Sequence, residues 1–245
     1  MVDLIGDERL DHLFTDQSIQ IIQSPTVFSY SIDAVLLARF ASMPLRRGKI
    51  IDLCTGNGVI PLLMSKFTEV PITGIEIQKR LYDMACRSIL HNKKQDQINM
   101  IHGDIKDMPA YFGNNKFDLV TVNPPYFKTT SEKQLNKNDH LTIARHEVYV
   151  SLEQVIDVSS QLVKPGGKFA MVHRPGRLVD IVNLMRQYKL EPKRIQFVYP
   201  KSGKEANILL VEGIRDGKPD LKLLPPLYVY DEEGNYTKGM QELVY

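Results

Sequence analysis

Short apolar runs alternate with segments of helical periodicity along most of the chain. Five runs have the length and apolar content of buried strands, at residues 49–54, 72–77, 98–102, 117–122 and 168–173. Five segments repeat their apolar residues at helical spacing, at residues 33–43, 59–66, 78–94, 152–163 and 178–188. Strands that alternate with helices are typical of α/β proteins with a parallel sheet. We therefore expect a doubly wound, Rossmann-like sheet whose ligands bind beyond the carboxyl ends of the strands.

The pattern changes near the C-terminus, where two strand-like runs follow each other without a helix between them. The runs 195–199 and 207–213 predict an antiparallel pair. The expected sheet is then seven-stranded and mostly parallel, with a terminal antiparallel strand. We expect a single domain over 1–245, with 1–30 as an N-terminal lid or extension and 215–245 as a tail packed on the domain.

The composition is that of an ordinary globular protein, since 43% of the 245 residues are hydrophobic and 24% are charged. No apolar run approaches the ~20 residues that span a bilayer, and the acidic first 16 residues lack the basic start and apolar centre of a secretory signal. We therefore expect a cytoplasmic protein with no membrane partner. Cys54 and Cys86 form no Cys/His cluster with zinc spacing, so we expect reduced thiols and no metal.

Basic residues concentrate in one stretch of a chain whose net charge is only +2. Residues 164–204 hold ten Lys or Arg against two acids, a local charge of +8, whereas residues 1–16 hold five acids against one Arg, a charge of −4. A phosphate-binding face produces such an asymmetry, and so does a solvated surface of helices and loops. The charge pattern therefore allows a nucleic-acid partner without requiring one.

A glycine-containing turn follows the first strand, in Asp52-Leu53-Cys54-Thr55-Gly56-Asn57-Gly58. Glycines let the backbone turn sharply and approach a ligand closely, and the helix that follows offers free N–H groups. Glu76 ends the next strand, where a carboxylate can accept both ribose hydroxyls of an adenosine. These features fit either a dinucleotide or S-adenosylmethionine.

Positions 52 and 61 discriminate between the two cofactors. A dinucleotide fingerprint needs Gly or Ala where this chain has Pro61, and Asp52 would repel a pyrophosphate. S-adenosylmethionine carries an ammonium and a sulfonium, so acids near the turn favour it. Asp104 follows the third strand and can accept the adenine amine. Each acid alone is also typical of a helix cap or turn, but three acids at successive strand ends favour a cofactor site.

The motif Asn123-Pro124-Pro125-Tyr126 directly follows the fourth strand. An exocyclic amine of a base is a poor nucleophile, because its lone pair is delocalised into the ring. The Asn123 side-chain oxygen and the Pro124 carbonyl can each accept one amine hydrogen, which localises the lone pair and orients it for in-line attack. The prolines fix φ and keep that carbonyl in place, and Tyr126 can stack on the base. A rigid strand-end turn is the alternative interpretation.

Together these residues resemble the class I methyltransferases, and most closely the bacterial tRNA(Val) adenine-37 N6-methyltransferase family. The resemblance covers almost the whole chain and is carried by Phe28 to Leu37, Asp52 to Gly58, Glu76, Asp104, Asn123 to Tyr126, and Ala144-Arg145-His146-Glu147. The chain departs from the general pattern at Cys54, where many methyltransferases have a first glycine. The resemblance implies methylation of adenine N6 in the anticodon loop of tRNA.

On these grounds we assign three sets of site residues. The cofactor-binding set is Tyr30, Asp33, Asp52, Cys54, Gly56, Gly58, Glu76, Asp104 and Asn123, with Tyr30 and Asp33 at the methionine end of S-adenosylmethionine. The catalytic set is Asn123, Pro124 and Tyr126. The substrate-binding set, toward tRNA, is Pro125, Tyr126, Phe127, Arg145, His146, Arg174, Lys201 and Lys204, of which three lie on a polar stretch at 127–149 that predicts a loop.

Other substrates remain open, because Asn-Pro-Pro-Tyr also resembles the motifs of DNA adenine and protein glutamine methyltransferases. The alternatives are a ribosomal RNA guanine-N2 or protein glutamine-N5 methyltransferase and, from another class, a non-catalytic RNA- or nucleotide-binding domain. The intact motif at Asn123 disfavours the last, because binding alone needs no aimed amine acceptors. The sequence does not determine the oligomeric state.

Overall fold

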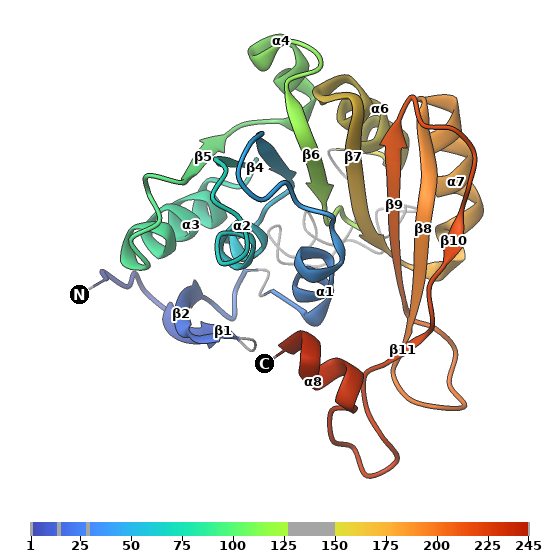
Figure 1. The fold of residues 1–245 in the computed structure, drawn as a ribbon. Helices are drawn as coiled ribbons and strands as arrows, with labels where there is room; N and C mark the ends of the chain where they lie inside the picture. The colour runs from blue at the N-terminus through green and yellow to red at the C-terminus, as the bar shows by residue number, and fades with distance from the viewer. Residues whose placement is uncertain (1, 14–15, 28–29, 127–149, 245) are drawn as a thin grey trace, which may run out of the picture.

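A nine-stranded sheet forms the centre of the computed structural model, which describes residues 2–13, 16–27, 30–126 and 150–244 (Figure 1). Its strands in spatial order are β10 (Lys222–Leu223), β8 (Leu190–Tyr199), β9 (Ile208–Arg215), β7 (Val163–His173), β6 (Phe117–Val122), β3 (Ile50–Leu53), β4 (Ile72–Glu76) and β5 (Ile98–His102), and β11 (Leu227–Tyr228) also pairs with β8. Within this sheet, β9 runs antiparallel to β7 and β8, and the other described pairs are parallel. The seven longer strands confirm the predicted mostly parallel sheet, and β10 and β11 add two residues each at its edge.

The strand order reverses at β3, and this reversal places the site. From β3 the chain continues to β4 and β5 on one side and then returns to β6 on the other. Leu53, at the end of β3, pairs with Val122 of β6 and with Ile75 of β4. The turn after β3 and the segment after β6 therefore start side by side at a topological switch point, where doubly wound sheets bind ligands.

Helices cover both faces of the sheet. On one face lie α1 (Ile32–Phe40), α2 (Val59–Met64) and α3 (Lys79–His91), and on the other lie α4 (Met108–Phe112), α6 (Leu152–Leu162) and α7 (Leu178–Gln187) (Figure 1). Neighbouring side chains of β3 point to opposite layers, since Ile50 belongs to the core with α1 and α2, and Ile51 to the core with α6 and α7. Burial on both faces explains why the central strands read as continuous apolar runs.

The N-terminal segment forms an antiparallel hairpin, β1 (Arg9–Leu13) and β2 (Asp16–Gln23), which the sequence did not predict. The hairpin packs against α3. The Ile22 N–H donates to Ser88 Oγ at 3.0 Å, and Arg87 forms an ion pair with Glu8 at 2.7 Å. Both strands contain many polar residues, so the alternation of apolar and polar positions that predicts a strand was not apparent. The role of residues 1–30 as a lid stays a prediction.

The C-terminal residues lie along β8 and α1 (Figure 1). Both β10 and β11 pair with β8, and Met240 of α8 (Lys238–Val244) is buried in the core that contains α1. Among the described residues, no helix is long and apolar enough to cross a membrane.

Some element boundaries differ from prediction because tertiary pairing overrides local signals. The fifth strand was expected to begin at Lys168, but β7 already begins at Val163, which pairs with Phe117 next to a register shift. β8 begins at Leu190 instead of Ile195, because its first residues pair with the end of β9. Helix α1 ends at Phe40, three residues before the predicted end.

Candidate active site

The turn after β3 contains three residues with a left-handed backbone, Cys54, Gly56 and Gly58, with φ of 56°, 60° and 84°. Glycine adopts such φ values without steric cost. At Gly58, which precedes α2, an added Cβ would also lie 3.1 Å from the Cβ of Ala85 on α3. Cys54 adopts the same backbone region despite its side chain, so the residue that departs from the glycine pattern occupies a position that glycine favours.

Asn57 fixes this turn to the N-terminal hairpin. Its side chain is 2% exposed, and Nδ2 donates to the backbone oxygen of Ile22 at 3.1 Å. Sequence analysis missed this residue, because nothing in the local pattern links it to a hairpin 35 residues earlier. Hydrogen bonds therefore hold the turn in place from β2 on one side and from the end of β4 on the other.

Glu76, at the end of β4, makes the second of these contacts with the turn. Its Oε2 accepts from the Gly56 N–H at 2.8 Å, and its Oε1 accepts from the Gln78 N–H at 2.9 Å. Burial raises the pKa of Glu76, and these two backbone hydrogen bonds oppose the shift. Each carboxylate oxygen has further lone-pair capacity, so the group can still accept hydrogen bonds from a ligand.

Asp104, after β5, both caps a turn and faces the same site. Its Oδ1 accepts from the Lys106 N–H at 3.0 Å at the start of η1 (Ile105–Asp107), and its Oδ2 lies 3.1 Å from Lys106 Nζ. The cap that the sequence offered as an alternative is thus present. It does not exclude a ligand contact, because Asp104 also lines the cavity described below.

The Asn123 motif is ordered by side chains from two other elements. The Tyr126 hydroxyl lies 2.6 Å from Asn123 Oδ1 and 2.8 Å from Asp33 Oδ2, near the start of α1, and can donate its one hydrogen to either oxygen. The Arg174 guanidinium lies over the Tyr126 ring, 4.7 Å from its centroid, and the His173 ring centroid lies 5.1 Å away. Burial, with the neighbouring Asp33, raises the pKa of Tyr126, so the phenol keeps its proton.

These residues line one cavity of ≈ 480 Å³, within the usual size range of small-molecule sites. It lies between the strand ends and α1. Its predicted lining residues are Tyr30, Asp33, Cys54, Gly56, Glu76, Asp104, Asn123, Pro124, Pro125, Tyr126 and Arg174. Three carboxylates, of Asp33, Glu76 and Asp104, share this cavity with one guanidinium. The excess of acids suits a ligand that carries positive charge and disfavours a pyrophosphate.

Two predicted cofactor residues lie outside the cavity lining. Gly58 shapes the turn without lining the cavity. Asp52 is fully buried within the sheet, where its Oδ1 accepts from Thr121 Oγ1 at 2.6 Å. Burial raises the pKa of Asp52 to about 7, so near neutral pH its carboxyl carries less negative charge than that of an exposed Asp. Asp52 thus lies within the sheet and outside the cavity lining, and its role toward the cofactor stays a prediction.

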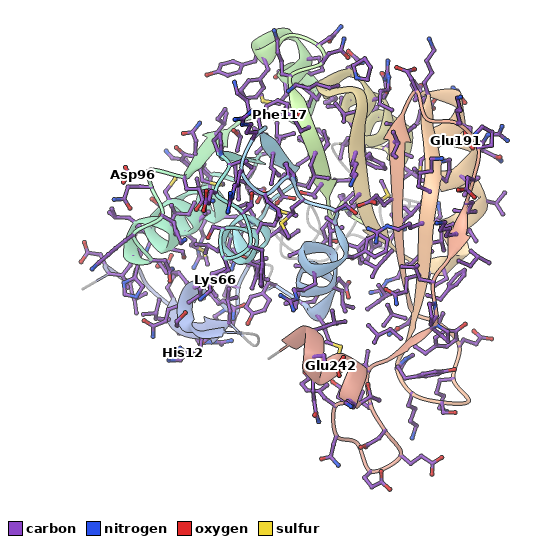
Figure 2. All side chains as sticks on the ribbon, in the orientation of Figure 1. His12, Lys66, Asp96, Phe117, Glu191 and Glu242 are labelled. Atoms are coloured by element: carbon purple, nitrogen blue, oxygen red, sulfur yellow. The ribbon has the colours of Figure 1, made fainter. Side chains whose placement is uncertain are left out.

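The basic stretch at 164–204 does not form one face, contrary to the suggestion of its charge. Arg174, Arg177, Lys201 and Lys204 lie at the cavity end of the sheet, whereas Lys164, Lys168, Arg186, Lys189 and Lys193 lie toward the opposite end. Figure 2 labels Phe117 and Glu191 at that opposite end. Arg194 lies between the two groups and binds the buried Glu212. Because residues 164–204 cross the sheet twice, in β7 and in β8, their basic side chains lie at both of its ends.

Lys201 and Lys204 are exposed in the loop between β8 and β9. The loop leads to Asn207 and Ile208, two cavity residues that sequence analysis missed. The signal was available, because an antiparallel strand that follows β8 must begin at the cavity end. The predicted substrate residues Phe127, Arg145 and His146 lie outside the described residues.

Comparison with protein families and with curated proteins gives consistent matches. Residues 18–187 match the model of the methyltransferase small domain. A tRNA1(Val) (adenine(37)-N6)-methyltransferase of Porphyromonas gingivalis is 30% identical over 207 residues, which cover 82% of this chain and 80% of the relative. A protein of the same name from Shewanella is 27% identical over 240 residues, which cover 94% and 96% of the two chains.

Solved structures show the same fold. A predicted O-methyltransferase from Agrobacterium tumefaciens superposes with a TM-score of 0.68 at 21% identity, covering 86% of this chain and 94% of that one. Geranyl diphosphate C-methyltransferase from Streptomyces coelicolor, solved with S-adenosyl-L-homocysteine, superposes with a TM-score of 0.56 at 13% identity, covering 75% and 78%. At these identities the likeness establishes the fold alone.

Proposed function

The chain belongs to the tRNA1(Val) (adenine(37)-N6)-methyltransferase family, with a methyltransferase small domain, and from this premise we propose that it methylates N6 of an adenine at position 37 of tRNA(Val). Membership of this family makes it a methyltransferase that depends on S-adenosylmethionine. The observation that carries the proposal is the position of Asn123. Its side-chain oxygen lies in an acid-lined cavity, one paired strand away from the Gly56 turn.

The residues of the cavity fit S-adenosylmethionine, which when bound supplies an electrophilic methyl group on a sulfonium. The three carboxylates favour its two positive charges over a phosphate ligand. Glu76 holds the Gly56 turn and has spare acceptor capacity for ribose hydroxyls. We assign Asp104 to the adenine amine, and Tyr30 and Asp33, from the segment that starts α1, to the methionine end, since all three line the cavity.

Asn123 and Pro124 act on the substrate amine. Two acceptors, Asn123 Oδ1 and the Pro124 carbonyl, each take one amine hydrogen and thereby return lone-pair density to the nitrogen. Pro124 and Pro125 have fixed φ, so these acceptors lose little freedom when the base binds. Neither acceptor is a strong base, and the surplus proton of the methylated nitrogen leaves to water. Orientation therefore supplies most of the acceleration.

The base that reaches this cavity must leave its stack in the RNA. The Tyr126 ring offers a stacking surface next to Asn123, and such stacks contribute ~1–3 kcal/mol per base. Lys201 and Lys204 lie in the exposed loop that leads to Asn207 at the cavity, which supports their assignment to RNA phosphates. In this arrangement the RNA backbone binds outside the cavity and one base binds inside it.

The test is to incubate the protein with radiolabelled S-adenosylmethionine and separate pools of tRNA, ribosomal RNA and protein, and to identify the labelled product. We expect N6-methyladenosine in tRNA, and loss of label when adenosine 37 of a tRNA(Val) transcript is replaced by guanosine. Label in guanine N2 of ribosomal RNA, or in glutamine of a protein, would replace this proposal by one of the alternative substrates.

A further inference from the structure

The Tyr126 ring has two close neighbours, Arg174 and His173. The Arg174 guanidinium lies over the ring at 4.7 Å from the centroid, and the His173 ring approaches at 5.1 Å with a tilt of 57°. His173 is 1% exposed and belongs to the protein interior. Arg174 is only half-buried and lines the cavity. Arg174 therefore covers a face of the Tyr126 ring at the cavity, where a substrate base would need to stack.

Arg174 is held by the backbone and not by an acid. Its Nη1 donates to the Asn207 oxygen at 2.8 Å, and its own N–H donates to His173 Nδ1 at 2.8 Å. Other arginines of the chain pair with carboxylates, as Arg194 does with Glu212 at 3.0 Å. Within the described ranges, no carboxylate forms an ion pair with Arg174. Its planar cation is therefore fixed at one edge and stacked on an aromatic ring, and among the described residues no carboxylate pairs with it.

We propose that Arg174 and Tyr126 together form a slot for the target base. The Arg174 guanidinium moves away from Tyr126 and stacks on the far face of the base, which then lies between the two side chains. This inference rests on the proposed function. A guanidinium and an aromatic ring both stack on the π face of a base. Asn123 accepts a hydrogen bond from Tyr126. A base whose amine is held by Asn123 therefore has its plane beside the Tyr126 ring. Arg174 is then a positioning residue that orients the base, while Asn123 acts on the amine.

A stacking role differs measurably from a contact with an RNA phosphate. Lysine keeps the charge but lacks the plane, so stacking predicts that R174K behaves like R174A. A phosphate contact predicts that R174K behaves like the unaltered protein, and that R174A lowers the slope of log affinity against log salt by about 0.7–0.9. Losing a stack that is present in both the bound ground state and the transition state raises KM for RNA with little change in kcat.

The experiment uses an anticodon stem-loop RNA with either adenosine or fluorescent 2-aminopurine at the target position, and the full-length variants R174A and R174K. The matched control is R186A, which removes an exposed arginine at the opposite end of the sheet. We expect both Arg174 variants to raise KM for RNA at least about 10-fold with kcat within about threefold. In their complexes 2-aminopurine should emit more brightly than in the unaltered complex, because one stacking partner is lost. R186A should match the unaltered protein in both measurements.

Two results would overturn the proposal. One is a wild-type KM for R174K together with a reduced salt slope for R174A, which assigns Arg174 to a phosphate. The other is unchanged KM and unchanged emission in both variants. The emission measurement needs no methyl transfer, so it still reports on the slot if the unaltered protein fails to methylate tRNA. Failure of the proposed function and failure of this inference are thus distinguishable.

Discussion

Tyr126 donates its hydroxyl hydrogen to the side-chain oxygen of Asn123 across 2.6 Å, so the acceptor that we assign to the substrate amine already has a donor. The same hydroxyl lies 2.8 Å from Asp33 Oδ2. A phenol has one hydrogen to donate. The hydroxyl can therefore turn fully to Asp33 when the amine reaches Asn123, while the ring stays beside the base.

Replacement of Tyr126 separates the ring from the hydroxyl. We expect Tyr126→Phe to keep kcat/KM for tRNA within about threefold, because the stacking surface remains. We expect Tyr126→Ala to lower kcat/KM by about 10-fold or more, the effect of losing one base stack. Steady-state methyl transfer to tRNA measures both. If Tyr126→Phe lowers kcat/KM as much as Tyr126→Ala does, the hydroxyl and not the ring accounts for the contribution of Tyr126.

Much of this site could be predicted from the sequence, because its residues follow directly on strand ends. Glu76, Asp104 and Asn123 each follow an apolar run, and parallel strands bring their carboxyl ends to one edge. Contacts between distant segments left no such signal. The bond from Asn57 to Ile22 and the backbone anchor of Arg174 on Asn207 depend on where the hairpin and β9 pack. Asp52 lies within the sheet and outside the cavity lining, which the sequence could not show, because sequence position gives the strand end but not which way the carboxylate points.

Glu76 tests the cofactor side of the cavity. Gln at this position has one acceptor oxygen in place of two and brings an NH2 group toward a backbone N–H, so it cannot hold both Gly56 and Gln78. We expect Glu76→Gln to raise the Kd of S-adenosylmethionine by about 10-fold or more, measured by calorimetry. Asp104→Asn is the matched control, because its amide oxygen can still accept, and its Kd should change less. Equal Kd values for Glu76→Gln and the unaltered protein would remove Glu76 from the cofactor site.

Asp52 makes stability depend on pH. Its pKa of about 7 in the folded state lies above the roughly 4 of an exposed Asp, so the folded protein holds this proton more tightly than the unfolded chain. Its contribution to the free energy of unfolding is therefore full below about pH 4 and is lost as the pH rises through about 7. Asp52→Asn can keep the hydrogen bond from Thr121 and does not titrate. We expect the Tm of this variant, relative to the unaltered protein, to be higher at pH 8 than at pH 5. A Tm difference that is the same at both pH values would contradict the assigned burial of the carboxylate.

The two lysines of the β8–β9 loop test where RNA lies. Replacing both Lys201 and Lys204 with Ala should weaken tRNA binding and flatten the slope of log affinity against log salt by about 1.4–1.8, because each contact releases counterions. The control replaces Lys168 and Arg186, which lie toward the opposite end of the sheet, and removes the same charge. Binding titrations at several salt concentrations give both slopes. Equal slopes for the two double variants would place the RNA elsewhere.

Asn123→Ala, assayed for turnover and for cofactor affinity on the same preparation, tests most directly whether the amine is activated by a side chain at this strand end. The variant loses one of two amine acceptors and leaves the Gly56 turn, Glu76 and Asp104 in place. We expect kcat for tRNA methylation to fall by about 100-fold or more, the size of effect seen when one preorganised hydrogen-bonding group is removed from an active site. The Kd of S-adenosylmethionine should stay within about twofold. A kcat close to that of the unaltered protein, or a loss of cofactor affinity as large as the loss of kcat, would contradict the role of Asn123.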